Sequence, residues 1–239
     1  MSPVLEVDAI IAGYGSAKAL HGASLTAARG EWIGLLGANG SGESTLLKCI
    51  SHQLAVQSGR ICVQGIDVAR DPTSARRHLG VAVAPEILPS ALTLTQCLEV
   101  YAAAFGLPAP ADLAAEVLEA MQLTAHSNKP LGALTLGLRQ RCSVTLALVQ
   151  KPSLLLLDES FNGLDARTAA TLESILAREV AAGQMAVVMA THALPLVERC
   201  CTTAVLLHEG KTFQQWNLNE GNDRRSLEAA IEGALGAMG

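Results

Sequence analysis

A short glycine-rich stretch, GANGSGEST at residues 37–45, constrains the fold of this chain more than any other feature. It follows an apolar run that predicts a strand over 31–36 and precedes a predicted helix over 45–52. Strand, glycine loop and helix in this order build a phosphate-binding loop, in which backbone N–H groups and the helix N-terminus hold an anion. The alternative is a glycine-rich turn that binds nothing.

The loop follows the template G-x-x-x-x-G-K-[ST] at every position except 43. Its glycines allow the backbone to aim successive N–H groups inward. We expect the Ser44 hydroxyl to hold Mg²⁺ and Thr45 to donate to a phosphate oxygen. The residues predicted to bind the nucleotide phosphates are Gly37, Asn39, Gly40, Ser41, Gly42, Glu43, Ser44 and Thr45.

Position 43 carries a glutamate where the template has a lysine that reaches the β- and γ-phosphates. A carboxylate roughly 4 Å from a phosphate oxygen is repelled by about 4 kcal/mol per unit charge at an effective dielectric of about 20. A Mg²⁺ ion drawn between the two anions would reduce this repulsion. The backbone cradle is retained, so we expect weak nucleotide binding and inefficient phosphoryl transfer, with Glu43 deciding the catalytic outcome.

A second part of the site is predicted in LLLLDES, where Asp158 and Glu159 end a short apolar strand. Asp158 can hold Mg²⁺ through its water shell, and Glu159 can polarise an attacking water as a general base. An apolar run that ends in Asp-Glu is common by chance. Here it follows a glycine loop and precedes FNGLD, which favours the functional interpretation.

Composition limits the fold and function classes. Half of the 239 residues are hydrophobic and only 3% are aromatic, which suits a buried parallel sheet flanked by helices. The net charge of −5 argues against a nucleic-acid partner. The six cysteines lack CxxC spacing, so we expect thiols in a reducing cytoplasm. No signal sequence and no apolar run of roughly 18 residues is found, so the chain is expected to be soluble by itself.

The pattern of periodicity predicts an α/β core interrupted by a helical segment. We expect strands at 4–12 and 31–36 and a strand pair at 59–64 and 79–84, then the Ala/Leu-rich, proline-punctuated segment 88–135 as an inserted helical subdomain. The core would comprise 1–87 and 136–239. Its second part is predicted to contain a helix over 139–150, a strand over 153–158, a helix over 166–182, a strand over 185–191 and a helix over 226–235.

With these motifs in order, the chain resembles the ATP-binding subunit of ABC transporters along nearly its whole length. ALTLGLRQR at 133–141 is similar to the signature motif of that family, usually LSGGQRQR. Thr135 stands for the serine, Leu136 replaces the first glycine, and Gly137 matches the second. The resemblance implies a P-loop NTPase fold with a mainly parallel core sheet and an N-terminal antiparallel β region. It also implies a dimer in which Thr135 and Gly137 of one subunit cap the ATP bound to the other.

The remaining landmarks of the family fall in the same order. Tyr14 lies where the family stacks an aromatic ring on adenine, although a surface tyrosine is the simpler alternative. Glu86, in VAPE, replaces the glutamine that meets Mg²⁺. Asp165, in NGLD, matches the D-loop, and His192, in MATHAL, matches the switch histidine that contacts the γ-phosphate and holds Glu159.

Two functions are left open by the sequence. In the first, the chain is an ATPase peripheral to the cytoplasmic side of the membrane, which uses ATP and Mg²⁺ to drive transmembrane permease subunits, with export favoured by the signature form. In the second, it is a nucleotide-binding regulatory subunit that pairs with a competent partner. Cassette proteins of translation or DNA repair fit poorly, because they carry two cassettes or long coiled-coil insertions. The transported substrate is not encoded in these motifs.

Overall fold

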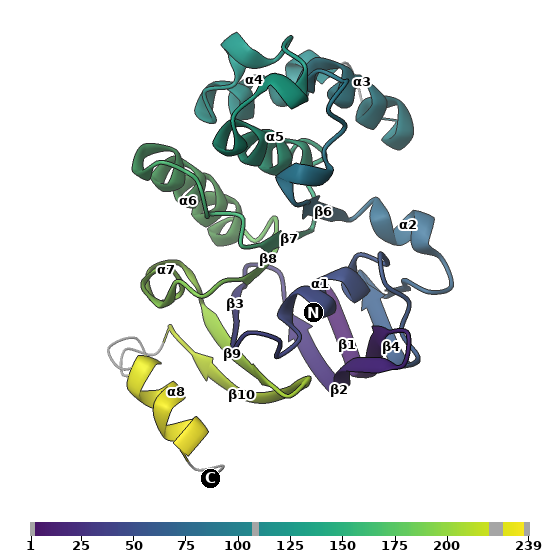
Figure 1. Cartoon of the computed structure of the whole chain (residues 1–239), viewed down its shortest axis with the longest axis vertical. Coiled ribbons are helices and arrows are strands. Elements are labelled where there is room, and N and C mark those ends of the chain that lie inside the picture. The colour runs from purple at the N-terminus through teal and green to yellow at the C-terminus, as the bar shows by residue number, and fades with distance from the viewer. Residues whose placement is uncertain (1–2, 107–109, 220–226, 237–239) are drawn as a thin grey trace.

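The computed structural model describes residues 3–106, 110–219 and 227–236, and consists of two sheets beneath a layer of helices (Figure 1). The smaller sheet is antiparallel, with the strand order β2-β1-β4-β5. Its long hairpin places Leu5 opposite Ala27 and Tyr14 opposite Ala17. The strands of this sheet are β1 (Leu5–Tyr14), β2 (Ala17–Ala27), β4 (Ser58–Val63) and β5 (Ile66–Asp67).

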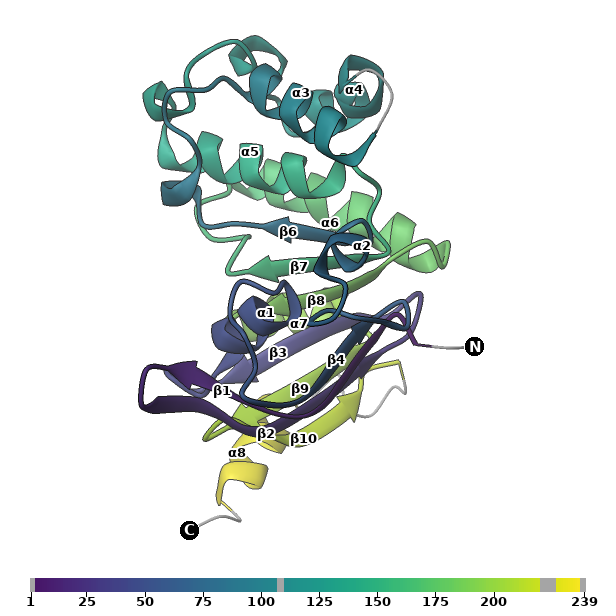
Figure 2. The same ribbon diagram turned by 90° about the vertical axis from the view of Figure 1, so that its right-hand side faces the viewer.

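The larger sheet has the order β10-β9-β3-β8-β7-β6, and Figure 2 shows it descending from β6 under the helical layer to β10. All neighbouring pairs are parallel except β9 with β10, which form an antiparallel hairpin at one edge. The strands are β3 (Trp32–Gly37), β6 (Leu79–Ala82), β7 (Leu154–Asp158), β8 (Ala186–Ala190), β9 (Thr203–His208) and β10 (Lys211–Asn217). The expected α/β fold with a mainly parallel core sheet and an antiparallel N-terminal region is confirmed.

Alternate residues of the central strands face two separate hydrophobic cores. Trp32 and Leu36 of β3 pack into one, and Ile33 and Leu35 pack into the other. The first core is closed by helices and the second by α1 and the antiparallel sheet. Continuous apolar runs such as AVVMA are therefore required, because both faces of these strands are covered. The helices that surround the core sheet are α1 (Glu43–Ile50), α2 (Pro72–Arg76), α6 (Ala166–Ala181), α7 (Leu194–Cys200) and α8 (Leu227–Gly236).

A helical layer lies above β6 and β7, and its elements fall mostly within the predicted 88–135 segment (Figure 1). Helix α3 begins with a capping box between Thr93 and Gln96 and ends at Gly106, whose φ of 65° is left-handed. The layer contains α3 (Leu94–Phe105), α4 (Pro110–Ala120) and α5 (Leu136–Leu148), with short 3₁₀ turns η1 (Pro85–Ile87), η2 (Thr124–His126) and η3 (Leu131–Ala133). The division into core 1–87 and 136–239 and subdomain 88–135 stays a prediction.

Several local predictions are corrected by the structure. The segments predicted as a strand pair, 59–64 and 79–84, do contain β4 and β6, but β4 pairs with β1 and β6 pairs with β7 in the other sheet. Sequence periodicity identifies such strands without identifying their partners. The helix expected over 45–52 begins at Glu43, so that Glu43 and Ser44 form its first turn. Strands β2, β9 and β10 and helix α7 were not predicted.

No helix in the described part of the chain combines the length and the apolar character needed to cross a membrane.

Candidate functional site

The glycine loop is held in a conformation that other residues would disturb. Gly40 and Gly42 have φ values of 86° and 113°, in the left-handed region that favours glycine. Gly37 has no room for a side chain, because a β-carbon there would lie 2.1 Å from Ser41 Oγ and 2.8 Å from the Leu207 carbonyl oxygen. The three glycines therefore fix the tight course of the chain between β3 and α1.

The loop is anchored to the turn between β9 and β10. The Gly210 amide donates to the Ser41 carbonyl at 3.0 Å, and the His21 amide donates to the Gly210 carbonyl at 2.8 Å. These bonds connect the loop to both sheets. Beside the exposed Gly40 lies an open hollow of about 460 Å³, lined by Lys18, Ala19, His21, Gly40, Glu209, Gly210 and Lys211.

Ser44 and Asp158 meet where β3 and β7 end. Asp158 is the last residue of β7, and its Oδ1 accepts a hydrogen bond of 3.0 Å from Ser44 Oγ. Both strands run in the same direction on either side of β8, so their carboxyl ends lie at one edge of the sheet. A hydroxyl and a carboxylate oxygen at this spacing are suitable donors for Mg²⁺, which commonly binds through one or two carboxylates and substrate phosphates. The pair fits the predicted metal.

Glu159 is held in a strained backbone conformation by specific bonds. Its φ of 47° lies in the left-handed region, which is uncommon for residues other than glycine. Its amide donates to the Ala190 carbonyl at 3.0 Å, and its own carbonyl accepts from the Asn162 amide at 3.0 Å. In this conformation the Glu159 carboxylate reaches Thr191 and His192, which follow β8.

The Glu159 carboxylate is surrounded by three donors. Oε1 accepts from the His192 amide at 3.0 Å, and Oε2 accepts from Asn162 Nδ2 at 2.9 Å and from Thr191 Oγ1 at 3.4 Å. His192 Nε2 lies 3.7 Å from Oε1, and the histidine side chain is 59% exposed. Glu159 and His192, which were predicted from separate motifs, thus lie together. The arrangement can orient a carboxylate and a histidine toward one solvent-facing position.

Asn162 and Thr191 were not identified in the sequence. Each lies within three residues of a predicted site residue, in FNG and MATH, and each donates to Glu159. Gln140 was also missed; it is buried on α5 and its Nε2 donates to the Ser160 carbonyl at 3.2 Å. An amide or hydroxyl side chain beside a catalytic motif is the signal that could have identified Asn162 and Thr191.

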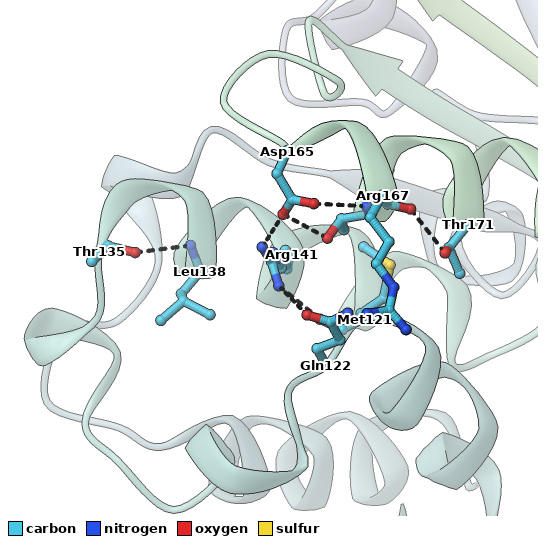
Figure 3. Close-up of polar contacts among 9 residues, drawn as sticks. Met121, Gln122, Thr135, Leu138, Arg141, Asp165, Arg167 and Thr171 are labelled. Carbon is cyan, nitrogen blue, oxygen red and sulfur yellow. Dashed lines mark hydrogen bonds and ion pairs between the residues drawn. The ribbon is translucent and has the colours of Figure 1, made fainter.

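The signature segment lies at the start of α5, next to the start of α6 (Figure 3). Thr135 caps α5, its Oγ1 accepting from the Leu138 amide at 3.3 Å. Gly137 packs so closely that a β-carbon there would lie 2.8 Å from the Gly163 carbonyl oxygen. Arg141 of α5 donates to the Asp165 carboxylate, which connects α5 to the start of α6.

Asp165 also caps α6. Its carboxylate accepts from the Thr168 amide at 3.0 Å and the Thr168 hydroxyl at 2.8 Å. These hydrogen bonds, with the Arg141 guanidinium as a further favourable charge, lower the pKa of Asp165 from its usual value. In this structure Asp165 therefore caps α6 and connects it to α5 through Arg141.

Tyr14 is exposed and is contacted by a cation. The residue is 52% exposed at the end of β1, and Lys48 Nζ lies 5.7 Å from the ring centroid and 3.3 Å from the phenol oxygen. An exposed aromatic face of this kind can stack on a planar base. Glu86 lies exposed in η1. Among the described residues, no hydrogen bond or ion pair connects Glu86, Thr135 or Gly137 to the loop at 37–45.

A glycine loop between strand and helix, with Asp158 at the end of a parallel strand nearby and Glu159 directly after it, defines the class: a P-loop nucleotide-binding cassette. The ABC transporter family matches residues 20–162, and the chain belongs to this family. It is an ATP-binding subunit of an ABC transporter.

Individual relatives agree with this assignment. The chain is 32% identical over 231 residues to the uncharacterized ABC transporter ATP-binding protein YdbJ of Bacillus subtilis, covering 96% of this chain and 74% of that protein. It is 31% identical to the daunorubicin resistance ATP-binding protein DrrA2 of Streptomyces coeruleorubidus, covering 87% and 65%. It is also 27% identical to the methionine import protein MetN of Brucella abortus, covering 87% and 58%. The solved ATP-binding subunit of an ABC transporter superposes with a TM-score of 0.86 at 27% identity, covering 96% and 95%.

Proposed function

We propose that this chain powers an exporter by ATP-driven dimer closure, and that Glu43 impairs its hydrolysis of ATP. The observations that carry the proposal are two contacts between predicted site residues, one at the glycine loop and one beside the end of β7. Ser44 Oγ donates to Asp158, and Glu159 accepts from the His192 amide, while the phosphate-binding loop departs from its template only at the lysine position.

Each side chain has a part in this proposal. Ser44 and Asp158 would hold Mg²⁺, which neutralises charge on the transferred phosphoryl group when bound. Glu159 would accept a proton from the attacking water, and its three donors keep the carboxylate oriented. His192 faces solvent beside Glu159, where it can donate to a phosphate oxygen. Tyr14 would stack on the adenine.

Dimer formation is proposed from the exposure of the signature segment. Thr135 is exposed at a helix N-terminus, and the neighbouring Leu136 is 51% exposed. Together with Gly137, these residues can cover an anion presented by a second ATP-binding subunit, because a helix N-terminus favours negative charge. The second subunit can be identical or related.

We propose that closure of the dimer moves transmembrane permease subunits. The chain would then lie peripherally on the cytoplasmic side of the membrane. Ile87, beside Glu86, is 66% exposed, and Val100 of α3 is 59% exposed. Large apolar side chains that face solvent near a helical layer suit contact with another protein. Export is supported by the form of the signature and by DrrA2, whose name indicates drug resistance, although MetN is named for import.

The test is ATP hydrolysis by the purified chain and by Glu43→Lys, with and without co-expressed permease subunits. We expect lysine to raise turnover by about a hundredfold or more, because it places a positive charge that is fixed to the chain beside the phosphates, where the parent has a carboxylate. Glu43→Lys combined with Glu159→Gln is the matched control and should remain inactive. Equal, negligible turnover in Glu43→Lys and its parent, with ATP bound by both, would contradict the proposal.

The second candidate is a regulatory subunit that binds nucleotide and leaves hydrolysis to a partner. It is favoured by one observation: Glu43 Oε1 is buried inside the loop and does not face solvent. In that case Glu43→Lys would bind ATP without turnover. A dimer of this chain with a competent cassette would contain one hydrolysing site.

A further inference from the structure

We propose that Glu43 and Ser41 bind a second divalent cation, which offsets the repulsion between Glu43 and the nucleotide phosphates and so permits ATP to bind. This site is distinct from the Ser44–Asp158 pair. The inference rests on nucleotide binding at the loop and assigns a ligand to the residue that departs from the template.

The Glu43 side chain turns back over the first glycine of the loop. The position of a β-carbon on Gly37 lies 2.2 Å from Glu43 Oε1, 2.1 Å from Ser41 Oγ and 2.8 Å from the Leu207 carbonyl oxygen. A carboxylate, a hydroxyl and a backbone carbonyl therefore gather at one side of Gly37. Oxygen donors of these three kinds are the usual protein ligands of hard divalent cations.

Two of these oxygens are buried and lack a partner. Ser41 is 5% exposed. Neither Ser41 Oγ nor Glu43 Oε1 has a hydrogen-bond partner among the residues that the structure describes. Within the same residues, no lysine, arginine or histidine forms an ion pair with Glu43. A buried carboxylate oxygen is costly without compensation, and a bound cation provides it.

The charge at the site selects a divalent cation. A lysine contributes one positive charge beside the phosphates, and a carboxylate with one divalent cation contributes the same net charge. A monovalent cation would leave the pair neutral. Mg²⁺ commonly binds through one or two carboxylates together with substrate phosphates, and Glu43 offers the carboxylate.

The two cations have separate positions because Glu43 and Ser44 point in different directions. Both lie in the first turn of α1, and neighbouring residues of a helix do not share a face. Ser44 Oγ reaches Asp158 Oδ1 at 3.0 Å, whereas Glu43 Oε1 lies over Gly37. A single ion at Ser44 and Asp158 therefore leaves the Glu43 oxygen unpartnered.

The test counts bound Mn²⁺, used as a paramagnetic probe, by electron paramagnetic resonance in the full chain with and without ATP. ATP binding is measured in the same samples with a fluorescent analogue. We expect the parent chain to hold one more Mn²⁺ per bound ATP than Glu43→Gln, which keeps the size of the side chain and removes its charge. Asp158→Asn should lose the other Mn²⁺ and keep this one, and Ser41→Ala should weaken Mn²⁺ binding at the Glu43 site.

The outcomes separate this inference from the proposed function. Equal Mn²⁺ counts in the parent and Glu43→Gln, with ATP bound by both, would overturn the second cation site and leave the ATP-binding role intact. Failure of the parent to bind ATP at any Mn²⁺ concentration would overturn both. Thermal unfolding of each variant shows whether a lost ion reflects a lost fold.

Discussion

Ser44 and Asp158 lie 114 residues apart in the sequence and are joined by a hydrogen bond of 3.0 Å between the serine hydroxyl and the carboxylate. The bond brings the start of α1 to the end of β7 and places two oxygen donors side by side. The two donors come from a helix and a strand, so the site is carried by rigid elements.

Replacing Ser44 with alanine is expected to raise the Mg²⁺ concentration required for ATP binding by about tenfold or more, because a metal-ligating hydroxyl is lost. ATP binding measured during a Mg²⁺ titration checks this. Ser44→Thr keeps the hydroxyl and serves as the control. An unchanged Mg²⁺ requirement in Ser44→Ala would show that the serine is not a ligand.

Replacing Glu159 with glutamine in the Glu43→Lys background should lower hydrolysis by about 10²- to 10⁴-fold, the usual contribution of a general base. ATP binding should persist, since Glu159 contacts Asn162, Thr191 and the His192 backbone and lies outside the loop. Phosphate release and ATP-dependent dimer formation are the two measurements. Parallel loss of binding and hydrolysis would instead indicate a structural role.

Replacing Asn162 with alanine removes the 2.9 Å hydrogen bond to Glu159 Oε2. In the Glu43→Lys background we expect turnover to fall roughly 10- to 150-fold with little change in the Michaelis constant, because a hydrogen bond to a charged group contributes about 1.5–3 kcal/mol. Asn162→Gln, which retains an amide, is the comparison variant. A change confined to the Michaelis constant would argue against an orienting role.

Replacing Gly37 with alanine should abolish ATP binding and destabilise the fold by about 1–3 kcal/mol, because the new methyl group would overlap Ser41 Oγ and Glu43 Oε1. Gly233→Ala in α8 is the matched control, since a β-carbon there meets no atom within 4 Å. Urea unfolding and nucleotide binding are measured for both. If Gly37→Ala bound ATP normally, the loop would have to be wider than the structure shows.

The Glu173–Arg199 pair predicts a pH dependence of stability. Arg199 donates to Glu173 at 2.7 and 2.9 Å, and these bonds lower the pKa of Glu173 from its usual 4.5. The stabilisation is therefore present above pH 4.5 and is lost as the pH falls through the lower folded-state value. Glu173→Gln should cost about 0.5–1 kcal/mol at pH 7 and progressively less below pH 4.5. Urea unfolding at several pH values measures this difference; a constant difference down to pH 3 would contradict it.

Much of the candidate site could be predicted from the sequence because its residues occur in short local motifs. The glycine loop, the Asp158–Glu159 pair and His192 each follow an apolar strand, and parallel strands bring such ends to one edge of a sheet. The positions of Glu159 and His192 relative to each other follow from β7 and β8 being neighbours.

The features that were missed depend on pairing across long distances. Strand β9 pairs with β3, and β10 pairs with β9, in registers that no local pattern records, and β10 is mostly exposed. The left-handed Glu159 and the turn of Glu43 over Gly37 are likewise set by surrounding contacts. Local periodicity predicts which segments are strands and leaves their partners open.

Strand β3 pairs only with β8 and β9 among the described strands, and both lie more than 140 residues further along the chain. A ribosome releases the glycine loop first, but Gly210, which anchors it through Ser41, emerges only after β8 and β9. The hydrophobic strand β3 therefore stays unpaired until β8 and β9 have been made, and an unpaired strand is prone to aggregation. Nucleotide can therefore bind a completed loop only after the turn between β9 and β10 has been made.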